Sequence, residues 1–187
     1  MRAWWFMRSW LSLSGFLTAT FAACAVGGFF TATSVGTWYR TLRKPGWNPP
    51  AWLFGPVWTV LYVMMAAAAW RVWPLRQQSG VAAVILGFFV QLVLNAGWSA
   101  CFFGLRKPGA ALGEIVLLWL LLVWLLWRFW MLDRWAGVLW APYVLWVSFA
   151  TGLNFAIWRL NAICRQSGRP ARVQAAGGTT ARNTAKK

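Results

Sequence analysis

Five long runs of apolar residues dominate the sequence, and each is close to the length that a membrane-spanning helix requires. A helix needs roughly 20 apolar residues to cross the hydrocarbon layer of a bilayer. Apolar residues make up 60% of the 187 residues, which is more than the core of a small soluble domain can bury. We therefore predict an all-α fold, an integral membrane bundle of five transmembrane helices. The predicted helices cover about residues 10–30, 51–73, 81–103, 109–131 and 137–160.

Short polar or proline-bearing segments separate these runs. The longest, residues 31–50, contains Pro45, Pro49 and Pro50, which exclude a continuous helix. The first apolar run is too long for the h-region of a signal peptide, so we expect it to remain as a helix. We expect the transmembrane domain to cover residues 1–160. Because residues 161–187 are basic and poor in apolar side chains, they are expected to form a disordered tail.

The basic residues are unevenly distributed between the two sides of the predicted bundle. With five crossings, the N-terminus and two of the turns carry six Lys and Arg, whereas the long loop, the remaining turn and the C-terminal segment carry twelve. Positively charged flanks stay in the cytoplasm, so the long loop and the C-terminus are predicted to be cytoplasmic. The net charge of +16 is spread over helix ends and the tail, which favours anionic lipid headgroups as its partner and not a nucleic acid.

The scarcity of titratable side chains limits the possible chemistry. The chain has no histidine and only two acids, Glu114 and Asp133. This composition excludes histidine bases, carboxylate pairs, catalytic triads and nearly every metal site, so we assign no catalytic or metal-binding residue and expect no cofactor. The widely spaced Cys24, Cys101 and Cys164 are expected to be free thiols. Glu114 lies near the beginning of the fourth predicted helix, where we expect it to stabilise the helix end or to connect helices, for example through Arg or Trp, and not to relay protons.

Polar and aromatic side chains recur at helical spacing in three of the predicted helices. The members are Trp58, Tyr62 and Met65; Gln91, Asn95 and Trp98; and Trp146, Ala150, Leu153 and Asn154. Each set lies on one face of its helix. The 18 tryptophans also exceed what the aromatic belts at the membrane surface need. Aromatic walls with a few polar tips suit a flat, largely apolar ligand with polar edges, although such stripes also arise where helices only pack or bridge.

Two pairs of small residues are spaced four apart on the predicted helices. Gly109 and Gly113 form a GxxxG motif, and Ala96 and Ala100 form a similar pair. Small residues at this spacing let helices approach closely, either within one chain or between subunits.

Four longer motifs carry a family resemblance. They are WYxxLxKPxWxPP at residues 38–50, GPVWTxLYxxM at residues 55–65, LNxxWSxxFFG at residues 94–104 and PYxxWxxFAxxLNxxIWxxN at residues 142–161. In order and spacing these motifs resemble the TspO/MBR family, which includes bacterial tryptophan-rich sensory proteins and the mitochondrial translocator protein, also called the peripheral-type benzodiazepine receptor.

The resemblance implies a five-helix bundle, usually a homodimer, here in a bacterial cell envelope. It implies a pocket that opens toward the long loop and binds porphyrins, with protoporphyrin IX as the expected ligand. The residues carried over as ligand-binding are Trp58, Tyr62, Asn95, Trp98, Trp146, Ala150 and Leu153, and those carried over as covering the pocket are Trp38, Lys44, Pro45 and Trp47. We therefore expect a sensory or regulatory membrane protein that binds tetrapyrroles. The alternatives are a porphyrin transporter and a light-dependent porphyrin-degrading enzyme in which Trp58 and Trp146 are redox-active.

Members of the family also bind sterols. The sequence pattern associated with this binding lies in the last helix and consists of Leu or Val, then Tyr, then Lys or Arg. Leu153 and Arg159 match this pattern here, but Phe155 occupies the position of the tyrosine. A phenyl ring cannot hydrogen-bond a sterol hydroxyl, so we expect poor sterol binding.

Overall fold

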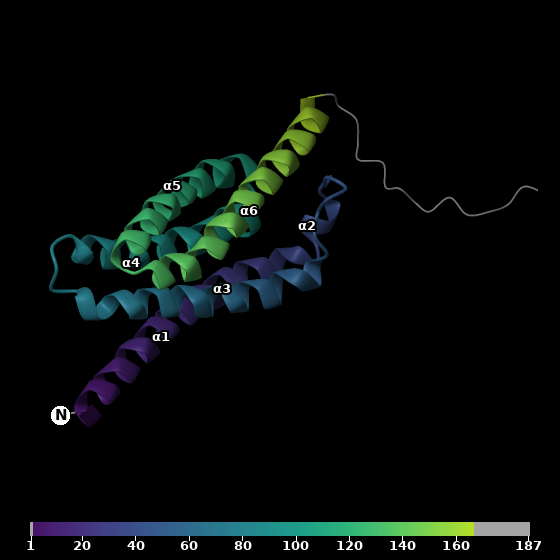
Figure 1. Cartoon of the computed structure of the whole chain (residues 1–187). Coiled ribbons are helices and arrows are strands. Elements are labelled where there is room, and N and C mark those ends of the chain that lie inside the picture. The colour runs from purple at the N-terminus through teal and green to yellow at the C-terminus, as the bar shows by residue number, and fades with distance from the viewer. Residues whose placement is uncertain (1, 167–187) are drawn as a thin grey trace, which may run out of the picture.

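The computed structural model describes residues 2–166, and the regular elements there are all helical (Figure 1). Its helices are α1 (Arg2–Val35), α2 (Trp38–Thr41), α3 (Ala51–Val72), α4 (Val81–Ser99), α5 (Pro108–Leu132) and α6 (Arg134–Gln166). A 3-10 turn, Trp73–Leu75, follows α3, and a π-helical turn, Ala100–Gly104, follows α4. Within the described residues, five helices are long and apolar enough to cross a membrane, and α2 is too short. The predicted all-α bundle of five membrane helices is confirmed.

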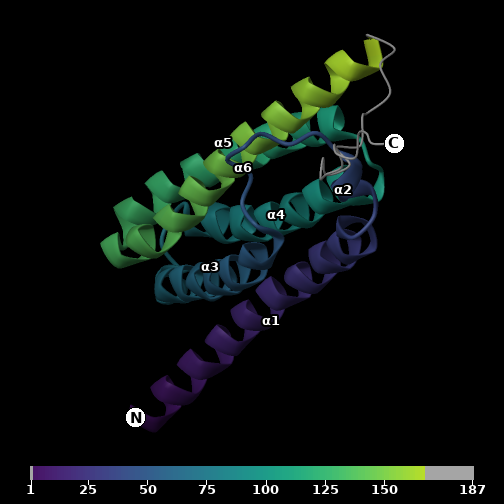
Figure 2. The ribbon, with the colours of Figure 1, turned by 90° about the vertical axis from the view of Figure 1, so that its right-hand side faces the viewer.

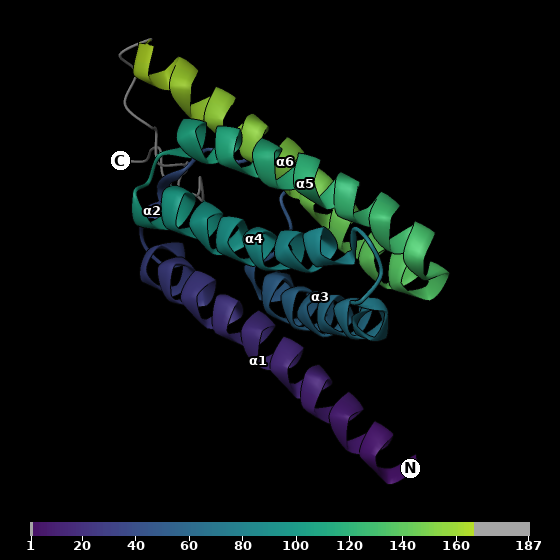
Figure 3. The same ribbon diagram turned by 90° about the vertical axis from the view of Figure 1, so that its left-hand side faces the viewer.

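The five long helices form one bundle with distinct ends. α5 packs along α6, α1 lies against α3 and α4, and α3 also contacts α6 (Figures 2 and 3). The short α2 and the C-terminal end of α6 lie at one end of the bundle, whereas the N-terminus lies at the other (Figure 1). The loop between α1 and α3 therefore covers the same end of the bundle as the last turns of α6.

The interior of the bundle is apolar and rich in aromatic side chains. Its largest fully buried members include Met65, Phe88, Phe129, Trp140 and Tyr143. The indole N–H of Trp140 donates to the carbonyl of Leu122 at 3.2 Å, which joins α6 to α5. A second buried cluster lies near α2 and consists of Tyr39, Phe102, Phe103, Ala111, Leu153 and Ile157.

α1 is longer than the predicted helix of residues 10–30 and takes in the first part of the predicted loop. Thr31 lies inside the helix because its hydroxyl donates to the carbonyl four residues earlier, at 2.9 Å. Ser34 is also buried, and its hydroxyl donates to the carbonyl of Phe103 at 2.8 Å. Because backbone carbonyls satisfy these hydroxyls, the helix continues past the point where the sequence becomes polar.

α5 and α6 both begin slightly earlier than predicted. α5 begins at Pro108, because proline suits the first position of a helix, where its missing N–H costs nothing. α6 begins at Arg134 because Oδ1 of Asp133 accepts a hydrogen bond from the N–H of Ala136 at 2.9 Å and so caps the helix.

α6 also extends beyond the predicted end of the domain at residue 160. It continues through Asn161 to Gln166, so the prediction that the disordered tail begins at residue 161 is wrong. The Asn161 side chain donates to the carbonyls of Ile157 and Arg43 at 2.7 and 3.0 Å, and it accepts from the N–H of Arg43 at 3.1 Å. The two hydrogen bonds with Arg43 connect the loop between α1 and α3 to α6. The rest of the predicted tail, residues 167–187, lies outside the described residues.

A salt bridge joins Arg71 to Asp133 at the end of the bundle opposite α2. Nε and Nη2 of Arg71 donate to the two carboxylate oxygens of Asp133 at 3.0 and 2.8 Å. These hydrogen bonds hold the pKa of Asp133 below its usual range. The pair connects α3 to the turn between α5 and α6, and it is the one salt bridge within residues 2–166.

Glu114 does not make the predicted connection between helices. Its carboxylate lies close to Gly97 of α4, and neither buried oxygen has a hydrogen-bond partner among the described residues. The prediction was wrong because helical spacing does not reveal which residue of a neighbouring helix faces a given side chain, and here a glycine faces Glu114.

Candidate functional site

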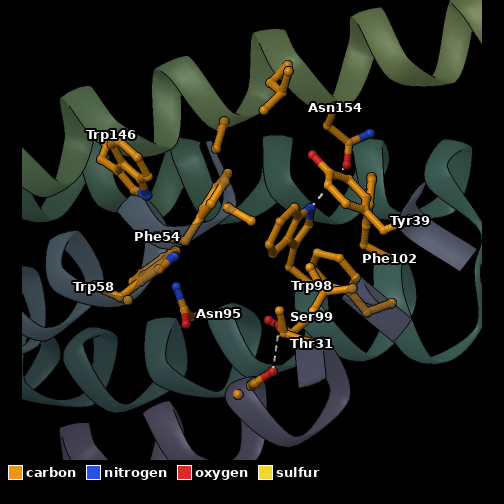
Figure 4. Close-up of a pocket in the computed structure, with 18 of the residues that line it drawn as sticks. Thr31, Tyr39, Phe54, Trp58, Asn95, Trp98, Ser99, Phe102, Trp146 and Asn154 are labelled. Atoms are coloured by element: carbon orange, nitrogen blue, oxygen red, sulfur yellow. Dashed lines mark hydrogen bonds between the residues drawn. The ribbon is translucent and has the colours of Figure 1, made fainter. Parts of the chain in front are cut away.

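A cavity of about 340 Å³ opens within the half of the bundle that lies near α2 (Figure 4). Its walls come from α1, α3, α4, the π-helical turn and α6, and Tyr39 of α2 completes them. Apolar and aromatic side chains predominate, and no acidic or basic side chain among the described residues lines it. A volume of this size lies within the range of small-molecule sites, roughly 300 to 1,000 Å³.

The seven residues that the sequence predicts to bind a ligand all line this one cavity. They are Trp58, Tyr62, Asn95, Trp98, Trp146, Ala150 and Leu153. Their helices are far apart in the sequence, and the bundle brings their predicted faces together. Sequence reasoning missed the contribution of α1, where Gly27, Gly28 and Thr31 form a further wall. These small side chains carry no aromatic or strongly polar signal that would have marked them.

Three tryptophans form the aromatic walls. Trp58 stacks on Tyr62 with ring centroids 5.4 Å apart and an interplanar angle of 30°. Trp98 stacks on Phe102 with the same centroid distance of 5.4 Å and the same angle of 30°. Trp146 meets Phe54 edge to face at 5.9 Å. These are the favoured geometries of aromatic pairs, so the walls are held in place before any ligand arrives.

A buried hydrogen-bond network fixes the polar side of the cavity. The hydroxyl of Tyr62 donates to Oδ1 of Asn95 at 2.7 Å, and Nδ2 of Asn95 donates to the hydroxyl oxygen of Tyr143 at 3.0 Å. Tyr143 donates in turn to Oε1 of Gln91 at 2.9 Å. The network ties α3, α4 and α6 together and holds the Asn95 amide at the cavity (Figure 4). Gln91 and Met65 share the predicted stripes but lie outside the cavity, where Nε2 of Gln91 donates to Sδ of Met65 at 3.8 Å.

The indole nitrogens of the three tryptophans differ in their environment. Nε1 of Trp98 donates to Oδ1 of Asn154 at 3.1 Å, and Nδ2 of Asn154 donates to the carbonyl of Pro108 at 2.8 Å. Figure 4 shows no hydrogen bond from Trp58 or Trp146 to the other side chains drawn. Trp98 is therefore a fixed wall, whereas Trp58 and Trp146 present N–H groups that a ligand can use.

The four residues predicted to cover the pocket lie outside its lining. They are Trp38, Lys44, Pro45 and Trp47, and none of them lines the cavity. Trp38 packs on Phe102 at 5.8 Å and Trp47 packs on Phe149 at 5.6 Å, and both phenylalanines do line it. The loop thus supports the wall from outside.

Tyr39 is the loop residue that reaches the cavity, and sequence reasoning did not select it. Its side chain is 8% exposed, and its hydroxyl donates to Oδ1 of Asn48 at 2.8 Å. Burial raises the pKa of Tyr39, so the phenol stays neutral at physiological pH. The only signal in the sequence was its place in the WYxxLxKP motif.

Metal-ligating side chains do not gather in the described part of the chain. Within residues 2–166, no group of three His, Cys, Asp or Glu side chains is placed to hold a metal ion. Cys24 and Cys101 are free thiols, and Cys24 lines the cavity. Nothing is described of the side chain of Cys164.

Comparison with known proteins gives a consistent set of relatives. Residues 16–159 match the TspO/MBR family. The tryptophan-rich protein TspO of Chlorobaculum tepidum is 46% identical over 72% of this chain and 86% of its own. The tryptophan-rich sensory protein of Cereibacter sphaeroides is 40% identical over 81% of this chain and 92% of its own. The translocator protein of Homo sapiens is 36% identical over 81% of this chain and 91% of its own.

Proposed function

The chain belongs to the TspO/MBR family, and on this premise we propose that it binds a tetrapyrrole such as protoporphyrin IX in the cavity of its helix bundle. Family membership and the five apolar helices make it an integral, multi-pass membrane protein. The proposed role is sensory or regulatory, which is supported by the name of its relative in Cereibacter sphaeroides, the tryptophan-rich sensory protein.

The observation that carries this proposal is the arrangement of Trp58, Trp98 and Trp146 around one cavity. A macrocycle is flat and largely apolar, so indole faces can stack on it while few polar groups need to be matched. Asn95 and the indole N–H groups of Trp58 and Trp146 would orient its polar atoms. The absence of charged side chains from the described lining favours an uncharged ring system at the centre of the site.

The setting that we propose is a bacterial cell envelope, with the protein as a homodimer and its C-terminus in the cytoplasm. Identity is higher to the relatives from Chlorobaculum tepidum and Cereibacter sphaeroides, at 46% and 40%, than to the human translocator protein, at 36%, which supports a prokaryotic envelope over a mitochondrial membrane. We also propose poor sterol binding through α6, because Phe155, which is exposed there, has no hydroxyl to bond that of a sterol.

The test is a titration of the purified protein with protoporphyrin IX in the dark, followed by porphyrin absorbance and tryptophan fluorescence. Trp58→Ala and Trp146→Ala each remove a stacking wall worth about 1 to 3 kcal/mol, so affinity should fall about 5-fold to 150-fold. Asn95→Leu keeps the side-chain volume but deletes the polar group, and it should cost less affinity than either tryptophan variant.

Trp127→Ala is the control, since Trp127 lies on α5, is 57% exposed and does not line the cavity. If this variant weakens binding as much as Trp58→Ala while circular dichroism shows intact helices, the porphyrin only partitions onto aromatic surface and the proposal fails. Illumination of the same complex separates binding from turnover. A stable bound spectrum supports a binding protein, whereas bleaching to a new product supports light-dependent degradation.

A further inference from the structure

A second, open hollow adjoins the cavity at the α2 end of the bundle. Val35, Tyr39 and Ala51 line both spaces, so the two lie side by side at these residues. The hollow differs from the cavity in its charge, because Arg40 and Lys44 line it and no acidic side chain does. An apolar space therefore lies beside a cationic one.

Tyr39 forms the boundary between the two spaces and holds one of the cations there. Nζ of Lys44 lies 4.4 Å from the centroid of the Tyr39 ring, which is a cation–π contact. The same ring packs against Phe103 at 5.6 Å, on the side of the buried cluster. The loop that carries Lys44 is itself fixed, because the backbone of Arg43 exchanges two hydrogen bonds with Asn161 of α6.

These two cations have no acidic partner in the described chain. The whole sequence has only two acids, and Asp133 is bound to Arg71 at the other end of the bundle. The second acid, Glu114, lines neither the cavity nor the hollow. The pKa of Lys44 lies below its usual range because of burial and the nearby positive charge of Arg40. An anion bound between the two side chains would relieve this repulsion.

We propose that Arg40 and Lys44 bind the carboxylate groups of the ligand whose apolar ring system occupies the cavity. The inference rests on the proposed function and deepens it, because it defines the ligand as a flat apolar body with acidic substituents on one edge. The two spaces share Val35, Tyr39 and Ala51 as lining, and this proximity is the reason for assigning the anion to the cavity ligand and not to a separate molecule. Carboxylates accept strong, charge-assisted hydrogen bonds from Lys and Arg.

The experiment compares protoporphyrin IX, which has two carboxylates, with its uncharged dimethyl ester. Both are titrated into the full-length protein in phosphatidylcholine nanodiscs, and the ratio of the two affinities is determined for each variant. The native protein should prefer the diacid. The double variant Arg40→Gln and Lys44→Gln should lower the affinity for the diacid about tenfold and leave that for the ester within about twofold. Lys44→Arg, which keeps the charge, should retain the preference.

Arg43→Gln is the matched control, because Arg43 lies in the same loop but lines neither space. It should leave the ratio of affinities unchanged. If the double variant loses affinity for the diacid and for the ester equally, the two side chains only support the wall. That result overturns the inference while the proposed function stands. Failure of the native protein to bind even the ester would instead refute the proposed function.

A repeat in nanodiscs that contain phosphatidylglycerol separates the ligand carboxylate from a lipid headgroup as the anion. A preference for the diacid in both lipids supports the proposal. A preference that disappears with phosphatidylglycerol assigns the hollow to lipid headgroups, because these would occupy it in an anionic membrane, and it overturns the assignment to the ligand.

Discussion

Tyr143 is a single residue on which the polar side of the cavity depends. Its side chain is fully buried, and its hydroxyl accepts from Asn95 and donates to Gln91. Tyr143→Phe removes only the oxygen, but it leaves both amides with an unmet hydrogen bond inside the bundle. Each unmet buried group costs about 1 to 3 kcal/mol, so we expect a clear loss of stability. Thermal unfolding in detergent, followed by far-ultraviolet circular dichroism, measures it.

Tyr39→Phe is the comparison for this prediction, since its hydroxyl makes a single side-chain hydrogen bond, to Asn48, and both residues line the open hollow. Water can replace that bond, so the loss of stability in Tyr39→Phe should be clearly smaller than the loss in Tyr143→Phe. Equal losses of stability in the two variants would contradict the view that the buried network of Tyr62, Asn95, Tyr143 and Gln91 stabilises the bundle around the site.

At the scale of helices, the two glycines of the GxxxG motif have different surroundings. A Cβ on Gly109 would lie 2.7 Å from Nε1 and 3.1 Å from Cδ1 of Trp158 on α6, whereas nothing lies within 4 Å of a Cβ on Gly113. The first glycine therefore permits the close approach of α5 and α6 within one chain. The sequence left packing within a chain and packing between subunits open for this motif.

Gly109→Ala should push the Trp158 indole or α6 outward and lower the stability of the bundle by about 1 to 3 kcal/mol. Gly113→Ala should be neutral or stabilise by up to about 1 kcal/mol, because alanine favours the helix and meets no neighbour. Denaturation of the two variants in parallel provides the measurement. If Gly109→Ala is as stable as Gly113→Ala, the contact between α5 and α6 is not tight at this point.

At the scale of the whole molecule, charge predicts how the bundle is oriented in the membrane. Six of the basic residues at the α2 end are Arg40, Arg43, Lys44, Arg106, Lys107 and Arg159. Together with the basic residues of the C-terminal segment, they outnumber those on the other side by twelve to six. The α2 end and the C-terminus should therefore face the cytoplasm.

Reporter fusions test this orientation. A reporter that is active only in the cytoplasm should be active after Lys187, and the same reporter fused after Asp133, in the turn between α5 and α6, should be inactive. The reverse result would invert the topology, and it would place the cationic hollow on the opposite side of the membrane.

Local patterns in the sequence sufficed for the five membrane helices and for seven of the residues that line the cavity. Runs of apolar residues predicted the five membrane-spanning helices. Spacings of three and four residues predicted the helix faces that carry Trp58, Asn95 and Trp146. Both signals can be detected in the sequence because each depends on residues that are close together in the chain. The ends of the helices were less predictable. α1 continues past residue 30 because Ser34 bonds a carbonyl of another segment, and no local pattern contains that partner.

The sequence by itself therefore determined that this chain is a five-helix membrane bundle with three aromatic faces, since helix formation and membrane insertion follow from local composition and period. Only the tertiary structure decided that these faces enclose one cavity and that α1 closes it. It alone placed Lys44 on the ring of Tyr39, and it left Glu114 beside Gly97 without a hydrogen-bond partner among the described residues. The physical reason is that these contacts join helices and loops far apart in sequence, and their partners are selected by how whole helices pack.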